Sequence, residues 1–275
     1  MSIHIKKHSP AYWQVTLDNP PLNLFDQGIS DALVSLIDEL ENDKEVKVVV
    51  FDSADPDYFM AHLDVVTAPQ LSLDPGPTGL SPWPDFTVRI ERAPFITVGV
   101  LRGRARGVGS EFMQAMDIRF ASRERAVLCQ IEVGTGLIPG GGGLERLPGL
   151  VGRARALEII VSSEDYDADT AALYGWVNRS IPDAELDAFV DRFAKRVSVF
   201  SKRAIATAKE IVNKRTGTAK VEDLASTQNV FFGMLASPET QQTLGSLLAA
   251  GLQQKGDVEY NLGENLGRIA EQSAG

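Results

Sequence analysis

Two glycine-rich passages, each containing a glutamate, constrain this 275-residue chain more than any other feature. The first, "GRARGVGSEF" (103–112), lies between an expected strand over 93–103 and an expected buried helix, and Glu111 follows its glycines. The second, "QIEVGTGLIPGGGGLERL" (130–147), also lies between a strand and a helix and contains Glu132. Glycine costs roughly 0.5–1 kcal/mol relative to alanine inside regular structure. Both passages therefore predict a backbone that approaches another group closely.

Three kinds of site use glycine-rich loops of this type. A dinucleotide fingerprint needs G-x-G-x-x-G between a strand and a helix, but the first passage supplies only part of it and has no acidic ribose partner in a fitting context. A P-loop needs G-x-x-x-x-G-K-[ST], and "PGGGGLERLPG" in the second passage lacks the lysine and the hydroxyl. The third kind presents backbone N–H groups at a helix N-terminus, where they favour negative charge. Such donors suit a developing oxyanion.

The overall charge narrows the classes of partner. A net charge of −10 and a pI near 4.9, without a block rich in Lys and Arg, argue against nucleic-acid binding. The single Cys129 excludes an internal disulfide framework and gives no zinc constellation, so no metal is expected. The sequence shows neither a signal-peptide core nor a run of ~18 apolar residues. We therefore expect a soluble, cytoplasmic protein without a membrane partner.

Strands and helices alternate in the N-terminal part, which is the α/β pattern. An edge strand is expected in "YWQVTLDNPP" (12–21), and a helix with Ser30 as its N-cap should end at the polar residues 41–43. A buried strand should follow over 46–52. The segment 68–86, with five prolines, predicts a long irregular excursion outside the core.

The character of the chain changes from about Ser162 onward. Amphipathic helices are expected there, with Gly175 marking the end of one helix and Pro182 the start of another. The last part, 217–275, predicts two or three more helices. With 44% hydrophobic residues the chain can bury one substantial core, so we expect one main domain with an appendage.

Five motifs follow one another along roughly residues 10–215. They are "NPPLN" (19–23), "YFMAHLDV" (58–65), "GRARGVGSEFMQAMDIRFA" (103–121), "QIEVGTGLIPGGGGLERL" (130–147) and "YGWVN" (174–178). Taken together, in this order and spacing, they resemble the motifs of the crotonase superfamily, the enoyl-CoA hydratase/isomerase family.

The resemblance implies a pair of backbone donors for the thioester oxygen. Leu63 matches the residue that gives the first N–H, and Ala61 and His62, which precede it, are expected to contact substrate. Val108, between two glycines, matches the second donor. His62 and Val108 both stand where the family usually has glycine, and a β-branched residue with φ > 0 would be an outlier. We expect both substitutions to affect the shape of the pocket.

Glu111 and Glu132 match the two glutamates of the hydratases. Adding water to an α,β-unsaturated thioester needs a base for the water that attacks C3 and an acid that supplies a proton at C2. The interpretation favoured here gives the C2 proton to Glu132 and the water to Glu111, and the reverse or a shared division stays open. Each glutamate also has a structural explanation. Glu111 would stabilise the first turn of a helix, where acidic side chains are favoured, and Glu132 would be an ordinary carboxylate at the end of a strand.

Other polar residues allow two interpretations each. For His62, proton transfer near neutral pH and packing beside the acyl or CoA path both stay open. One face of an extended segment would hold three arginines, which either meet CoA phosphates or pair with acids at the surface or a subunit contact: Arg102, Arg104 and Arg106. Four basic residues either bind phosphate or form a solvated helix face: Lys202, Arg203, Lys209 and Lys214.

The resemblance implies an α/β fold with a crotonase-like ββα spiral core and a helical C-terminal region. The core, residues 1–200, would hold the acyl-CoA site, and residues 201–275 would serve trimerisation and cover the site. Relatives assemble as trimers, often paired into hexamers. The predicted function is that of an enoyl-CoA hydratase-type lyase without metal or redox cofactor, since coenzyme A is part of the substrate. The alternatives are an isomerase or acyl-CoA hydrolase of the same superfamily, or a catalytically silent acyl-CoA-binding relative.

Overall fold

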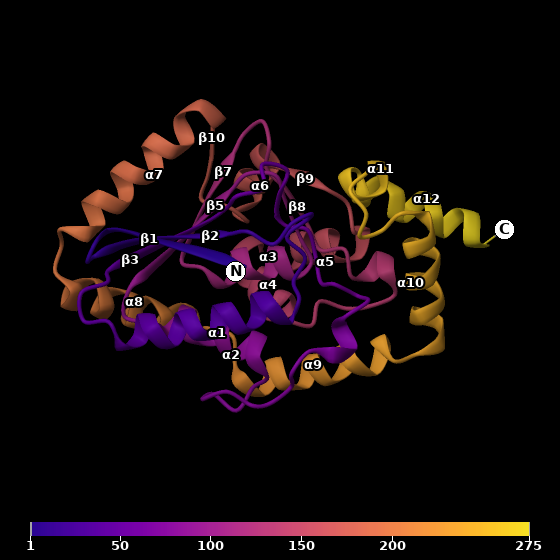
Figure 1. Ribbon diagram of the computed structural model, residues 1–275, viewed down its shortest axis with the longest axis horizontal. Helices are drawn as coiled ribbons and strands as arrows, with labels where there is room; N and C mark the ends of the chain where they lie inside the picture. The colour runs from indigo at the N-terminus through magenta and orange to yellow at the C-terminus, as the bar shows by residue number, and fades with distance from the viewer. Residues whose placement is uncertain (1, 275) are drawn as a thin grey trace.

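The computed structural model describes residues 2–274 and contains two β-sheets surrounded by helices (Figure 1). The larger sheet has the strand order β1-β2-β3-β5-β7-β10, and the smaller sheet has the order β4-β6-β8-β9. Neighbouring strands are parallel except for the pairs β1-β2 and β8-β9. The strands outside the repeat described next are β1 (Ile3–Ser9), β2 (Tyr12–Leu17), β9 (Tyr166–Asp167) and β10 (Arg179–Ile181).

A unit of two strands and a helix occurs three times in succession. In each unit the first strand joins the larger sheet, the second joins the smaller sheet, and a helix follows. This repeat confirms the predicted α/β fold with a ββα spiral core. The units are β3 (Val48–Ser53), β4 (Tyr58–Met60) and α2 (Pro82–Arg92); β5 (Ile96–Leu101), β6 (Arg104–Arg106) and α3 (Val108–Ala115); and β7 (Ile118–Ser122), β8 (Val127–Cys129) and α4 (Gly143–Val151).

Two predictions about the N-terminal part were wrong. Helix α1 (Gln27–Asn42) is capped by Asp26, whose Oδ1 accepts the Ile29 N–H at 2.9 Å, and not by Ser30, which is buried inside the helix. Strand β2 is not an edge strand, because β1 pairs with it on the outer side. The sequence of β1 hid that strand, since apolar residues alternate only over Ile3–Ile5 and the rest of the strand is polar or charged.

The excursion predicted over 68–86 is irregular only in part. It contains a short 3₁₀ turn, η1 (Ala68–Gln70), but from Pro82 onward the chain is helix α2. Proline fits the first turn of a helix because its missing N–H would have no partner there. Trp83 and Phe86 pack into the core, so this end of the segment is not outside it.

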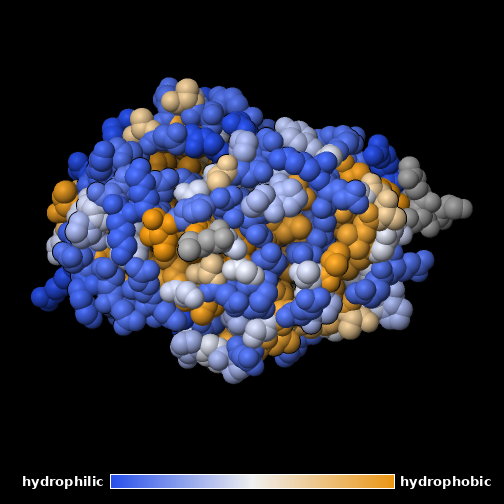
Figure 2. Space-filling model, viewed as in Figure 1, coloured by the Kyte–Doolittle hydropathy of each residue, from blue (hydrophilic) through white to orange (hydrophobic). Residues whose placement is uncertain are grey.

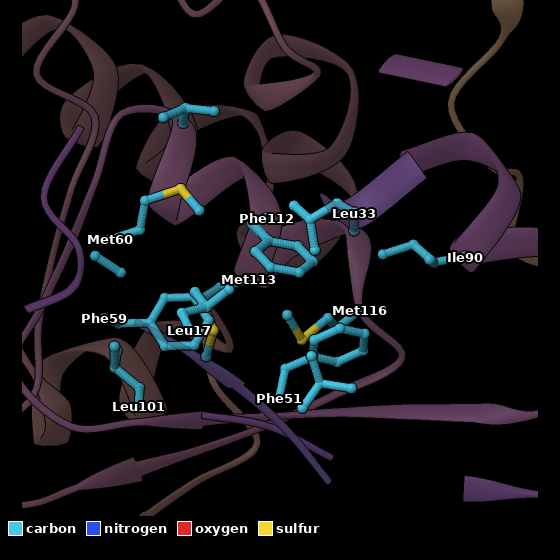
Figure 3. Packing of buried hydrophobic residues seen from close by; sticks show 14 of the residues in the cluster. Leu17, Leu33, Phe51, Phe59, Met60, Ile90, Leu101, Phe112, Met113 and Met116 are labelled. Atoms are coloured by element: carbon cyan, nitrogen blue, oxygen red, sulfur yellow. The ribbon is translucent and has the colours of Figure 1, made fainter. Parts of the chain in front are cut away.

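The core lies between the larger sheet and helices α1 to α3. Phe112 of α3 is fully buried, and its ring centroid lies 5.2 Å from that of Phe51 on β3 and 5.5 Å from that of Phe86. Figure 3 shows Met113 and Met116 in the same buried cluster as Phe112 and Phe51. The predicted buried helix is therefore confirmed.

The C-terminal region is helical apart from β9 and β10. Gly175 ends one helix in a left-handed conformation and Pro182 precedes another, as predicted. Four helices, instead of two or three, lie in the described part of 217–275, and they run along the lower and right-hand sides of the molecule in Figure 1. The helices are α5 (Arg153–Ser162), α6 (Ala168–Tyr174), α7 (Asp183–Ser198), α8 (Lys202–Thr216), α9 (Val221–Leu235), α10 (Pro238–Ala250), α11 (Asp257–Tyr260) and α12 (Leu262–Ala274).

The surface in Figure 2 is mainly hydrophilic, with apolar side chains gathered in a few separate places. Within residues 2–274, no helix is both long and apolar enough to cross a membrane.

Candidate active site

A largely apolar cavity lies where α2, the start of α3 and the second glycine-rich passage meet the C-terminal helices. Of the predicted site residues, five line this cavity: His62, Leu63, Val108, Glu111 and Glu132. The sixth, Ala61, does not line it, because its side chain is buried in a separate cluster with Leu22 and Tyr58. The prediction that Ala61 contacts substrate therefore does not match this geometry.

Glu111 sits in the first turn of α3, and its carboxylate is held by the second glycine-rich passage. Oε1 accepts the N–H of Gly141 at 2.8 Å and the N–H of Gly143 at 2.9 Å. Burial raises the pKa of Glu111 to about 7, while these two N–H bonds act in the opposite direction. The group can therefore change protonation state close to neutral pH.

Glu132 lies just after β8, at the start of the short turn η2 (Val133–Thr135). Burial raises the pKa of Glu132 well above its ordinary value, and the negative charge of Glu111 raises it further. Two buried carboxyl groups that repel each other hold a proton more readily than two separate ones. The pair can thus offer one protonated and one ionised carboxyl group in the same cavity.

A chain of buried amides orients Glu132. Gln130 Nε2 donates to Glu132 Oε2 at 3.2 Å, and Gln130 Oε1 accepts a hydrogen bond of 2.9 Å from Gln114 Nε2. The sequence did not reveal these two glutamines as site residues. Gln114 follows Glu111 by three positions on the short helix α3, which is the only local signal that could have pointed to it.

The glycines explain how the two glutamates come together. A Cβ on Gly141 would lie 2.4 Å from Glu111 Oε2 and 2.3 Å from Trp83 Nε1, and a Cβ on Gly107 would lie 3.0 Å from Glu132 Oε1. Gly107 also has φ of 48°, which disfavours a side chain. The predicted close approach of the backbone is thus confirmed, and the groups approached are the two carboxyls.

Val108 does not occupy the strained conformation that its position suggested. The positive φ belongs to Gly107, and Val108 is the first residue of α3. The N–H of a residue in the first turn of a helix has no partner carbonyl within that helix. The Val108 N–H also has no other acceptor within residues 2–274. The N–H of this cavity-lining residue is therefore free.

The Leu63 N–H is left free by the way its strand pairs. Leu63 and Phe25 form an isolated parallel bridge, in which the Phe25 N–H binds the His62 carbonyl and the Asp64 N–H binds the Phe25 carbonyl. These bonds use the groups on either side of Leu63, and its own N–H has no acceptor in the described part of the chain. Two unpaired backbone donors thus belong to residues that line the cavity of the glutamates.

The ambiguous basic residues are mostly held by protein groups. Arg102 pairs with Asp183 at 2.8 Å, as one interpretation expected. Arg106 pairs with an acid as well, Asp165 at 2.6 Å, but it is buried and not at the surface. Arg104 is also buried, and both arginines bind carbonyls of the C-terminal segment. Lys209 is also buried, 2.8 Å from Asp117, so the helix face that it occupies is not solvated there. Two other basic residues of this group also bond to protein groups. Lys202 donates to the Asp43 carbonyl at 3.0 Å, and Lys214 donates to the Glu210 carboxylate at 2.5 Å.

The far wall of the cavity was not predicted from the sequence. It comes from α9, α10 and the turn after α10, and its residues are Gln228, Phe231, Phe232, Leu244 and Leu252. Among the described residues, no cluster of three or more His, Cys, Asp or Glu side chains could hold a metal ion.

The ββα spiral holds two carboxyl groups, at the start of α3 and after β8, in one cavity with two residues whose backbone N–H groups are free. This combination defines a protein of the crotonase fold. The chain belongs to the enoyl-CoA hydratase/isomerase family, because the model of that family matches residues 8–251. This family acts on acyl-CoA thioesters.

Individual relatives agree with this assignment. The chain is 31% identical over 228 residues to a short-chain-enoyl-CoA hydratase of Clostridium acetobutylicum, covering 82% of this chain and 80% of the relative. It is 27% identical to a probable mitochondrial enoyl-CoA hydratase of Dictyostelium discoideum, covering 85% of this chain and 83% of the relative. A crystal structure of a candidate enoyl-CoA hydratase from Streptomyces avermitilis superposes with a TM-score of 0.92 at 39% identity, covering 97% of this chain and 96% of that one.

Proposed function

We propose that this protein is an enoyl-CoA hydratase-type lyase, which adds water across the C2–C3 double bond of a 2-enoyl-CoA thioester. One observation carries the proposal: two buried carboxyl groups with raised pKa values line the same apolar cavity as two residues with free backbone N–H groups. An isomerase or hydrolase that depends on one glutamate would not need the second carboxyl group. The names of the relatives support the same choice.

The two carboxyl groups divide the proton transfers. Glu111, whose pKa is about 7 and whose Oε1 is held by two backbone N–H groups, takes a proton from the water as its oxygen bonds to C3. The electron pair of the double bond moves toward the thioester oxygen. Glu132, the more strongly protonated group, then gives its proton to C2. Passage of the proton from Glu111 to Glu132 restores the starting state.

The free backbone donors stabilise the charge that develops on the thioester oxygen. In this account the N–H groups of Leu63 and Val108 bind that oxygen. One such donor typically contributes ~2.7–4 kcal/mol to transition-state stabilisation. The reaction is balanced by water and substrate alone, so we propose that no metal or redox cofactor takes part and that coenzyme A enters only as part of the substrate.

We also propose that the protein forms a homotrimer or a hexamer. Apolar side chains on α5 and α6 are exposed and would be covered by a subunit contact: Leu157, Val161 and Leu173. We further propose that the protein is located in the cytoplasm. Sedimentation of the purified protein tests the oligomeric state, since a monomer would contradict this part of the proposal.

The decay of the ultraviolet absorbance of crotonyl-CoA and of a longer 2-enoyl-CoA tests the function. Wild type should hydrate both substrates, and Glu111→Gln and Glu132→Gln should each lower the rate at least ~100-fold. Glu91→Gln is the matched control, because it removes a partly buried carboxylate that does not line the cavity. Turnover that is equal and negligible in all proteins, with CoA binding intact, would contradict the proposal and favour a silent relative. Double-bond migration or release of free CoA would favour the isomerase or the hydrolase.

A further inference from the structure

A buried hydrogen-bonded pair of side chains that the proposed reaction does not use joins the C-terminal region to the residue beside the first backbone donor. His62 Nε2 lies 2.8 Å from Glu259 Oε1, and the two side chains are 3% and 0% exposed. His62 immediately precedes Leu63, whereas Glu259 lies in α11, far along the chain. A carboxylate taken out of water needs compensating bonds to be retained.

The surrounding bonds occupy both ring nitrogens of His62. His62 Nδ1 lies 2.7 Å from the Leu63 carbonyl oxygen, which can only accept, so Nδ1 donates. Burial acts to raise the pKa of Glu259, but the His62 charge, the bonds from His62 and from the Gln253 N–H, and the Arg106 charge lower it overall. Nε2 is occupied by Glu259 Oε1 at 2.8 Å. Both ring nitrogens of His62 are therefore bound to protein groups, which leaves it no free nitrogen for proton transfer with a substrate.

Further bonds attach the C-terminal segment to the same stretch of backbone. Gln253 Nε2 donates to Asp64 Oδ1 at 2.7 Å, and Gln253 Oε1 accepts the Val65 N–H at 3.0 Å. Gln253 has φ of 63°, a left-handed conformation that is uncommon for residues other than glycine. Its backbone N–H reaches Glu259 Oε1 at 2.5 Å. The residues on both sides of Leu63 are thus hydrogen-bonded to one C-terminal segment, residues 253–259.

The same segment also holds the strand that leads to the second donor. Arg106 Nη1 donates to the Glu259 carbonyl at 2.6 Å, and Arg104 Nε donates to the Tyr260 carbonyl at 2.7 Å. These arginines form β6, which is followed at once by Gly107 and Val108. One short helix, α11, therefore bonds to side chains of residues next to both donors, to His62 before Leu63 and to the arginines of β6 before Val108.

We propose that His62 and Glu259 are positioning residues, through which α11 fixes the Leu63 N–H in the orientation that binds the thioester oxygen. Neither side chain reacts with substrate in this account, and the proposal rests on the proposed function only in assuming an acyl-CoA thioester in the cavity. Glu259 Oε2 is buried without a hydrogen-bond partner within residues 2–274, so the carboxylate is not optimally satisfied as a purely structural group.

The test compares His62→Gln, Glu259→Gln and the double variant, in which two amides can still bond to each other. A misplaced donor lowers kcat, and a displacement of about 1 Å can cost ~100-fold. We expect kcat for hydration to fall about 10- to 100-fold in each single variant, while KM changes less than about threefold. The double variant should fall no further than the worse single one, because the two residues act as a unit.

A control separates positioning from stability. Asp117→Asn removes the partly buried carboxylate that pairs with the buried Lys209 outside the cavity, and it should lower the melting temperature without changing kcat. If the three His62 and Glu259 variants lose stability to a similar degree and keep the wild-type kcat, the pair is only structural and the proposal is wrong.

A second measurement does not depend on turnover. Hydrogen bonds to the thioester oxygen polarise a conjugated acyl group, so a bound 2,4-dienoyl-CoA should absorb at longer wavelength than the free compound. The shift should be present in wild type and Asp117→Asn and should be smaller in His62→Gln and Glu259→Gln. An unchanged shift in the latter two would overturn the proposal. Loss of the shift in these variants, in a protein that fails to hydrate crotonyl-CoA, would sustain the positioning role and reject the hydratase function.

Discussion

The two walls of the cavity are built in different ways. The wall with the carboxyl groups comes from the junctions between strands and helices of the ββα units, where glycines let the backbone contact Glu111 and Glu132. The opposite wall comes from the side chains of α9 and α10, and its members on these helices are mostly apolar. In the first wall the backbone itself forms the site, whereas the second consists of side chains, most of them apolar. We therefore expect changes in the first wall to affect the chemical step and changes in the second to affect the choice of acyl group.

The largest effect is expected from Gly141→Ala. The new Cβ would lie 2.4 Å from Glu111 Oε2, so either the carboxylate or the loop must move. We expect kcat/KM to fall ~100-fold or more, since small displacements of reacting groups cost about that much. Steady-state hydration of crotonyl-CoA measures it. Gly149→Ala is the control, because nothing lies within 4 Å of the added methyl group. An active Gly141→Ala variant would show that the close contact does not place Glu111.

The pH dependence should report the two carboxyl groups directly. Because Glu111 must be ionised to act as a base, kcat/KM should fall as pH drops below its pKa of about 7, by about tenfold per pH unit. Because Glu132 must be protonated, kcat/KM should also fall on the alkaline side of its raised pKa. The profile measured with crotonyl-CoA should thus be bell-shaped. Activity that stays constant from about pH 5 to pH 7 would contradict the role of Glu111.

A smaller effect is expected in the apolar wall. Phe231→Ala on α9 removes an aromatic side chain from the cavity, and we expect the ratio of kcat/KM for a longer 2-enoyl-CoA over crotonyl-CoA to change ~10-fold. The absolute rate with crotonyl-CoA should change less. Val230→Ala, the preceding and exposed residue, should leave the ratio unchanged. If the ratio is the same in both variants, this wall does not select the acyl group.

The smallest effect concerns stability. The folded-state pKa of Glu111 is raised from 4.5 to about 7 by burial, so its stabilising contribution is present at low pH and is lost as pH rises through this range. Glu111→Gln keeps an acceptor for Gly141 and Gly143 without a charge. We expect its free energy of unfolding to exceed that of wild type by about 1–2 kcal/mol near pH 8 and to match it near pH 5. Urea titrations at both pH values test this. If the difference in free energy of unfolding between the variant and wild type is the same at both pH values, burial does not raise the pKa of Glu111.

The sequence was most informative where function depends on local backbone. Glu111, Glu132 and Val108 stand within short motifs whose glycines have a steric reason, so these residues could be found without a structure. The ββα order was predictable for the same reason, because each unit is contiguous along the chain. Ser30 failed as a cap because Asp26, four residues earlier, offered an equally good side chain.

The parts that could not be predicted depend on contacts between distant residues. The phenylalanines of α9 and the Glu259 partner of His62 lie far along the chain from the residues they meet, and no spacing rule connects them. The abundance of prolines over 68–86 predicts that residues 82–86 lie outside the core, although two of those prolines lie within the first turn of a buried helix. Tertiary packing decided these cases.

The most direct test of the central claim follows the atoms of the added water. Crotonyl-CoA is incubated with the protein in water labelled with heavy oxygen, and separately in deuterated water, and the products are analysed by mass spectrometry. The account predicts a 3-hydroxyacyl-CoA that carries the heavy oxygen at C3 and a deuterium at C2, both absent with Glu132→Gln. Free coenzyme A, a shifted double bond or unlabelled substrate from the wild-type protein would contradict it.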